Sequence, residues 1–189
     1  MVSARELALA LYGVSRLVKL DRAAVQYFDN TPEAFWRSFN AAVIAAPAYA
    51  LLVLLNFPDP APAASELRIL SVETTAYVVG WVLFPLVMAS FTDAVGCGRH
   101  YYRFIVAWNW SVVLQVFVFL GVTAFAASGA LPASLAGLLS LIATFAILFF
   151  QGFVAHVMLD VRPGIAALIV GIDLTIGIGL SLVSRGFYV

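Results

Sequence analysis

The segment that decides the fold spans residues 164–184 and reads GIAALIVGIDLTIGIGLSLVS. A helix that crosses a hydrocarbon core of roughly 30 Å needs about 20 apolar residues, and this segment has that length. A tight turn, Asp160–Gly164, precedes it, and the charged Arg185 follows it. The segment therefore predicts a transmembrane helix with one carboxylate, Asp173, near its middle.

The whole chain has the composition of an integral membrane protein. Of its 189 residues, 63% are hydrophobic and 11% are charged, whereas soluble domains have about 25% charged residues. The mean hydropathy is +1.02. A soluble protein of this length could not bury so much apolar surface. Ten Lys and Arg balance ten Asp and Glu, so no basic excess indicates nucleic acid. The composition excludes a soluble enzyme, a disordered chain and, with Cys97 alone, an intrachain disulfide.

Four further apolar segments share this length, and turns rich in Pro, Gly, Ser or Asp separate them. Pro85 is expected to kink the second. The sequence thus predicts an all-α, polytopic membrane helix bundle that occupies residues 31–189. Its five transmembrane helices are expected at residues 38–57, 71–92, 102–127, 133–158 and 164–184.

The apolar residues within 3–28 recur at a helical period, which predicts an amphipathic helix. Residues 1–30 are therefore expected to form a separate N-terminal segment. This helix could lie on an anionic membrane surface or dock on the rest of the protein or on a partner. The sequence leaves these alternatives open. Thr31 and Pro32 suit the N-cap and the first position of the next helix.

The distribution of Lys and Arg predicts the orientation. With the N-terminus in the cytoplasm, eight lie on the inner side and two on the outer side, as the positive-inside rule requires. The C-terminus is then outside, and the Arg- and Ala-rich composition suggests a bacterial inner (plasma) membrane. The inner set is Arg5, Arg16, Lys19, Arg22, Arg37, Arg99, Arg103 and Arg162, and the outer set is Arg68 and Arg185.

Asp173 is the sharpest candidate site residue, because a carboxylate in the middle of a membrane span is costly and commonly functional. Counting from the span centres places Gln115 and Thr144 at the same depth. Asp173 could bind a proton or a cation there. It could instead stay neutral and hydrogen-bond to a neighbouring helix, which we favour because no second acid or base is expected at that depth.

Asn109 and Gln151 are expected to form a second polar layer. The short turn at residues 128–132 makes the third and fourth spans neighbours, so the two amides could hydrogen-bond, at roughly 1 kcal/mol. We expect this layer to hold helices together, with a polar cavity as the alternative.

Small residues recur every four positions in the last span, at Ala167, Gly171, Thr175 and Gly179. Such a stripe lets another helix approach closely. Asp173 is about 200° around the helix from Gly171, at 100° per residue. Both faces therefore favour neighbours, which predicts that this helix is central or lies at an oligomer interface.

A metal site is a weak alternative. Cys97 and His100 have a Cys-x-x-His spacing, and His156 and Asp160 are four residues apart on one helix, at the same end of the bundle. The simpler interpretation is a free cysteine and two interfacial histidines. We therefore expect no metal and no cofactor. The chain shows no nucleophile elbow, phosphate loop or paired carboxylates, so we expect no enzyme.

Residues 99–110, RHYYRFIVAWNW, place a short basic and aromatic stretch before a span. In this segment and in its five-span topology over residues 35–184, the chain resembles the Ypt-interacting (Yip) family of membrane proteins and its bacterial relatives. The acidic-Tyr-Gly-Pro motif of the eukaryotic members is absent, and Asp29–Pro32 stands in its place. The resemblance implies a cytoplasmic N-terminal segment, an outside C-terminus and no catalytic residues.

These observations predict a non-enzymatic scaffold or an accessory subunit of a membrane protein complex, which meets its partners through helix faces and residues 1–37. The alternative is a small transporter or channel with Asp173 in its path. The expected partners are the lipid bilayer and either other membrane proteins or further copies of this chain.

Overall fold

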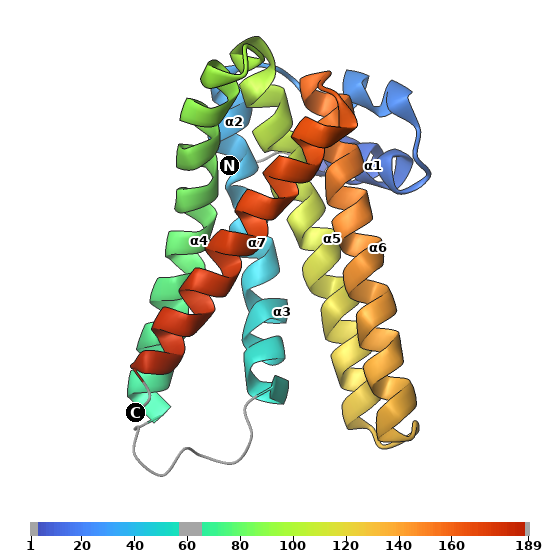
Figure 1. The fold of residues 1–189 in the computed structure, drawn as a ribbon, viewed down its shortest axis with the longest axis vertical. Helices are drawn as coiled ribbons and strands as arrows, with labels where there is room; N and C mark the ends of the chain where they lie inside the picture. Colours follow the sequence, from blue (N-terminus) through green and yellow to red (C-terminus); the bar gives the residue numbers. More distant parts are fainter. Residues whose placement is uncertain (1–3, 57–65, 188–189) are drawn as a thin grey trace.

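The computed structural model describes residues 4–56 and 66–187. This part of the chain contains seven α-helices and two short 3₁₀ helices. It contains no strand, which confirms the predicted all-α class. The proline-rich loop predicted after the first span lies outside the described residues. The helices are α1 (Ala4–Val18), η1 (Arg22–Tyr27), α2 (Pro32–Ser38), α3 (Asn40–Asn56), α4 (Glu66–Ala94), η2 (Gly98–His100), α5 (Tyr101–Ala127), α6 (Ala133–Leu159) and α7 (Pro163–Gly186) (Figure 1).

Five helical segments of the described chain are long and apolar enough to cross a membrane, which confirms the predicted bundle. The protein is therefore a multi-pass membrane protein. The second segment begins at Leu67, earlier than predicted, because α4 extends further towards the prolines. The segments are Pro32–Leu55, Leu67–Ala94, Gly98–Ala127, Ala133–Leu159 and Pro163–Gly186.

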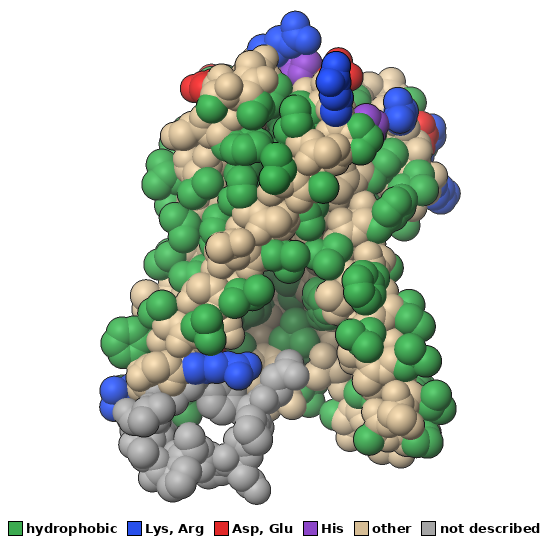
Figure 2. All heavy atoms as spheres, viewed as in Figure 1, with side chains coloured by type: hydrophobic (Ala, Val, Ile, Leu, Met, Phe, Trp, Pro, Cys, Tyr) green, Lys and Arg blue, Asp and Glu red, His purple; other side chains and the backbone are tan. Residues whose placement is uncertain are grey.

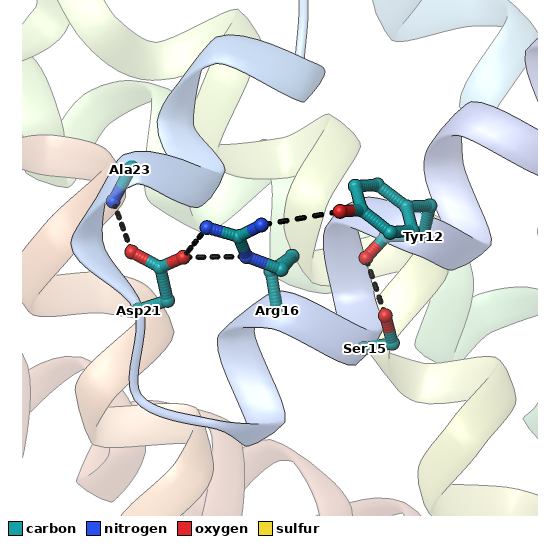
Figure 3. Close-up of polar contacts among 5 residues, drawn as sticks. All are labelled: Tyr12, Ser15, Arg16, Asp21 and Ala23. Atoms are coloured by element: carbon teal, nitrogen blue, oxygen red, sulfur yellow. Dashed lines mark hydrogen bonds and ion pairs between the residues drawn. The ribbon is translucent and has the colours of Figure 1, made fainter.

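The N-terminal helix is shorter than the sequence predicts, because the chain turns sharply after Val18. Leu20 takes a left-handed conformation with φ of 57°, and the Asp21 side chain then accepts a hydrogen bond from the Ala23 N–H at 2.9 Å. Asp21 thereby caps η1, as short polar side chains do at helix N-termini. Arg16 pairs with the same carboxylate across the turn (Figure 3).

The apolar face of α1 packs on α5 and α6 of its own chain. Val14 and Leu17 are 3% and 0% exposed. Gly13 allows η1 to approach closely, because a Cβ at this position would lie 2.8 Å from Phe28 Cζ. Of the alternatives left open by the sequence, the structure has the helix docked on the protein itself, while a flank with Leu11 stays exposed.

The first membrane segment is built from α2 and α3. Thr31 caps α2 as predicted, with its Oγ1 accepting a hydrogen bond from the Ala34 N–H at 3.2 Å, and Pro32 occupies the first turn. Phe39 joins the two helices, and α3 then packs along α5 through small residues. Ala41, Ala45 and Ala48 are all buried in this contact region.

Packing is tight at one end of the bundle and loose at the other. We call the two ends the α1 end and the turn end, after the Ser128–Pro132 turn between α5 and α6. All buried residues of α5 lie within residues 104–115, and those of α6 lie within 143–159, so both sets are on the side of the α1 end. Towards the turn end, α7 leaves α6 and lies against α4 (Figure 1). Figure 2 shows a hollow between the two groups of helices there.

Charged side chains gather at the two ends of the molecule, with apolar side chains between them (Figure 2). The elements that carry the inner set of basic residues all lie at the α1 end, and Arg68 and Arg185 lie at the turn end. The two sets of basic residues therefore lie at opposite ends of the bundle, as the counting predicts. The direction in which the bundle crosses the membrane stays a prediction.

Candidate functional site

Asp173 is joined to two glutamines on neighbouring helices. The Nε2 of Gln151 on α6 donates to Asp173 Oδ2 on α7 at 3.0 Å and to Gln115 Oε1 on α5 at 3.2 Å. Both glutamines are buried, with 8% of Gln115 and 5% of Gln151 exposed, whereas Asp173 is partly exposed. Three helices thus meet at one chain of polar side chains, and the carboxylate stands at its accessible end.

The predicted grouping of Asp173 with Gln115 is therefore found, but Gln151 belongs to this cluster and not to a layer with Asn109. Asn109 bonds in another direction, with its Nδ2 donating to Ser38 Oγ on α2 at 2.8 Å. Ser38 passes its own hydroxyl hydrogen to the Phe35 carbonyl at 2.7 Å. Asn109 thus ties α5 to the first membrane segment, because α3 and α2 lie on that side of α5.

Thr144 does not join the cluster. Its hydroxyl donates to the Ser140 carbonyl of its own helix at 2.9 Å, which is the common bond of an intrahelical threonine. The prediction that placed it beside Asp173 is wrong, because α6 is displaced along its axis relative to the assumed span centres. The shift puts Gln151 at the level of Asp173 instead.

A cavity of about 390 Å³ lies between α4, α5 and α7, and the cluster forms part of its wall. Four of the predicted polar residues line it, namely Asp173, Gln115, Gln151 and Asn109. A groove along α7 continues from Asp173 past Gly177 and Ser181 to Arg185, and so leads to the turn end. Towards the α1 end, α5 and α6 are closed by fully buried side chains, among them Phe104, Ile105, Met158 and Leu159.

Sequence reasoning missed the second acid in this cavity. Glu73 of α4 lines the cavity and accepts a hydrogen bond from the hydroxyl of Tyr49 on α3 at 3.0 Å. Its signal in the sequence is its place inside the second apolar segment, near the start of the span. The two carboxylates come from α4 and α7, which pack against each other at the turn end.

Aromatic rings from α3, α4 and α5 form part of the cavity wall. The ring centroids of Tyr49 and Tyr77 are 4.7 Å apart, and those of Tyr77 and Trp81 are 6.0 Å apart. Tyr77 is fixed by a hydrogen bond from its hydroxyl to the Ala42 carbonyl at 2.6 Å. Trp108 also lines the cavity, and it stacks on Phe84 with 4.5 Å between centroids.

Two buried polar atoms have no hydrogen-bond partner among the described residues. They are Ser111 Oγ and Gln115 Nε2, both on α5. Leaving a buried amide donor unpaired costs about 1–3 kcal/mol. Gln115 is the more informative of the two, because it lines the cavity and its oxygen is already bonded to Gln151.

The small-residue stripe of α7 faces away from the rest of the chain. All four of its members are exposed, and a Cβ at Gly171 or Gly179 would meet no atom within 4 Å. The stripe therefore does not form a packing face within one chain. The two faces of α7 differ, since the face with Asp173 looks into the hollow and the stripe looks outwards.

The residues of the weak metal alternative are engaged separately. His100 Nδ1 lies 3.1 Å from the Leu159 carbonyl, and His156 Nε2 lies 3.1 Å from the Arg22 guanidinium. Burial raises the pKa of the Cys97 thiol above its ordinary value, which disfavours the thiolate that binds metals. Among residues 4–56 and 66–187, no three His, Cys, Asp or Glu side chains are grouped so that they could hold a metal ion.

No family model, curated protein or solved structure matches this chain. The resemblance to the Ypt-interacting family therefore stays a prediction, and the function is argued from the geometry of the site.

Proposed function

We propose that this membrane protein is a small transporter or channel in which Asp173 is the ion- or proton-responsive group of an intramembrane binding cavity. The observation that carries the proposal is the position of Asp173, at the accessible end of the Gln115–Gln151–Asp173 chain and on the wall of the cavity. A carboxylate in this position can accept a proton or pair with a cation from the cavity.

The hydrogen bonding of the cluster supports a binding role over a purely structural one. A buried polar network that only holds helices together is normally satisfied throughout, because an unpaired donor in a low-dielectric interior is costly. Here the Gln115 Nε2 lacks a partner among the described residues, and Asp173 is the cluster's link to the groove on α7. An incomplete network beside a hollow suits a site that is completed by a solute.

The uneven packing supports the same proposal. The cavity is reached from the turn end, while the buried core closes the α1 end. A transporter needs a central site that is open to one side and closed to the other. The described arrangement has this asymmetry.

Reconstitution into proteoliposomes tests the proposal. We expect the protein to carry protons or monovalent cations down an imposed gradient, read with an entrapped pH- or cation-sensitive dye, and we expect Asp173→Asn to abolish the flux. Thr175→Val is the matched control, because Thr175 is exposed on α7 and its hydroxyl, within the described part of the chain, donates to the Gly171 carbonyl of its own helix at 2.8 Å. Equal flux through the native protein and Asp173→Asn would refute the proposal.

A scaffold or accessory subunit is the second candidate, and the exposed stripe of α7 favours it. Small residues at four-residue intervals on a lipid-facing surface allow a helix of another protein, or of a second copy, to pack closely. Pull-down in a mild detergent followed by mass spectrometry tests this candidate. A stoichiometric partner that is lost on Gly171→Leu would support it, and a protein purified alone with Asp173-dependent flux would exclude it as the main role.

A further inference from the structure

The cavity beside Asp173 combines aromatic rings with carboxylates. Tyr49, Tyr77 and Trp81 form a continuous wall, with neighbouring centroids 4.7 and 6.0 Å apart. The faces of such rings attract cations through their negative quadrupole, most strongly for Trp. Asp173 lines the same space and supplies negative charge, and Glu73, which accepts the hydrogen bond from Tyr49, is also part of the lining. The aromatic wall and Asp173 therefore favour a positively charged occupant.

The size of the cavity favours an organic occupant over a bare metal ion. Its volume of about 390 Å³ falls in the range of roughly 300–1,000 Å³ that is usual for small-molecule sites. A metal ion would instead need several close ligands, and the described residues offer no such group of three acids, histidines or cysteines.

Gln115 adds a requirement for an oxygen atom. Its Nε2 is buried without a partner among the described residues, while its Oε1 accepts a hydrogen bond from Gln151. An occupant that carries a hydroxyl or ether oxygen would accept the bond that this amide does not make within the protein. The cavity therefore suits a molecule that has a cationic group with an oxygen atom close to it.

We propose that the cavity binds a small organic ammonium ion that carries an oxygen acceptor. Asp173 provides the opposite charge, Trp81 and Tyr77 contact the cation through their rings, and Gln115 donates to the oxygen. This inference rests on the proposed function of the cavity and names the chemical class of its solute.

Calorimetric titration of the full-length protein in lipid nanodiscs tests the inference with two probes of the same shape. Choline carries a quaternary ammonium group and a hydroxyl, and 3,3-dimethylbutan-1-ol replaces the charged nitrogen by carbon. Discs of phosphatidylglycerol contain no choline headgroup, so the site is open to the free probe. We expect choline to bind at least about tenfold more tightly than the neutral alcohol, the typical size of a desolvated cation–π and charge contribution.

The variants separate the cavity from the rest of the surface. Trp81→Leu and Asp173→Asn should each weaken choline binding by about tenfold or more, and Trp81→Phe, which keeps a ring face, should restore part of the affinity. Trp36→Leu is the matched control, because Trp36 is 70% exposed on α2 and does not line the cavity. If Asp173→Asn does not fold, the three tryptophan variants still decide the question.

A second set of discs identifies the source of the ligand. If choline binding weakens when phosphatidylcholine replaces phosphatidylglycerol, a lipid headgroup competes for the site, and if it is unchanged the site takes a free solute. Equal affinity for choline and the alcohol, no choline binding in phosphatidylglycerol discs, or binding unaffected by Trp81→Leu would each overturn the inference. Asp173-dependent proton or cation flux would survive such a result, so the two proposals fail separately.

Discussion

The side-chain amide of Gln151 on α6 donates a hydrogen bond of 3.0 Å to the carboxylate of Asp173 on α7. The two residues meet because α6 and α7 are antiparallel neighbours joined by a very short turn. Asp160 ends α6 in a left-handed conformation, and Arg162 immediately precedes α7. The turn thus sets the register of the two helices, and it brings the Gln151 amide within hydrogen-bonding distance of the Asp173 carboxylate.

Replacing Gln151 by Leu should destabilise the bundle. The substitution removes the donor to Asp173 and leaves both ends of the buried Gln115 amide without a partner among the described residues, at a cost of about 1–3 kcal/mol. Thr144→Val, on the same helix, removes a hydroxyl that bonds only within α6 and should change stability by less than about 0.5 kcal/mol. Unfolding in mixed micelles of increasing denaturing-detergent content measures both, and equal stability of the two variants would contradict the role given to Gln151.

Truncation of two nearby polar residues of α5 should have different effects on the stability of the protein. Asn109→Ala removes the bond to Ser38 that ties α5 to α2 and should lower stability by about 1–2 kcal/mol. Ser111→Ala removes a buried hydroxyl that has no partner among the described residues, and should be neutral or stabilising. Thermal unfolding of both variants in one detergent gives the comparison, and a destabilised Ser111→Ala would reveal a partner for that hydroxyl.

Filling the hollow from α7 should stop ligand entry without unfolding the protein. Gly177 lines both the cavity and the groove, and a Cβ there would meet no atom within 4 Å, so Gly177→Leu extends into open space. We expect choline binding and flux to be lost. Gly171→Leu makes the same change in the outward-facing stripe, about 120° around the helix at 100° per residue, with the same gain in helix propensity, and should leave both intact. Retained flux in Gly177→Leu would place the path elsewhere.

Low pH should destabilise the turn between α1 and η1. The Ala23 N–H and the Arg16 guanidinium hold the pKa of Asp21 below its ordinary value. A depressed pKa means that the native state binds its proton less readily than the unfolded chain. The contribution of Asp21 is therefore present at neutral pH and is lost as the pH falls below about 4.

Asp21→Asn provides the test of this pH dependence. The variant should unfold at a lower temperature than the native protein at pH 7, and the difference should shrink as the pH falls towards 3 or below, because protonation removes the same charge. Ser15→Ala, an exposed position on α1, serves as the control and should keep a constant difference at all pH values. A difference between native protein and Asp21→Asn that persists unchanged in acid would refute the assignment.

The membrane helices could be predicted closely from the sequence, because the thickness of the bilayer sets the length of every apolar segment. The end of α1 could not be predicted, because the apolar periodicity of the sequence continues beyond it. The helix ends where Leu20 takes a left-handed conformation and Asp21 caps η1. The exposure of the Ala167–Gly179 stripe could not be predicted either. Apolar and small side chains can face lipid or another helix, so their pattern does not reveal which side is buried.

The candidate site was half predicted. The common depth of Asp173 and Gln115 follows from the centres of their spans, and Gln151 joins the two residues. Counting seven residues from the predicted span ends instead places Gln151 beside Asn109. Counting from the tight turn before α7 places Gln151 opposite Asp173. The sequence places Glu73 near the start of the second span, and only the packing of α4 on α7, which is a tertiary contact, brings it to the cavity.

The concentration of buried residues at the α1 end has a mechanical consequence. Residues 116–142, the part of the α5–α6 hairpin beyond the buried core, contain no buried residue. Few buried apolar contacts give a segment low local stability, so this part should open before the core around Phe104 and Leu159 does. Substitutions near the turn should therefore change the entrance to the cavity with little effect on the stability of the fold.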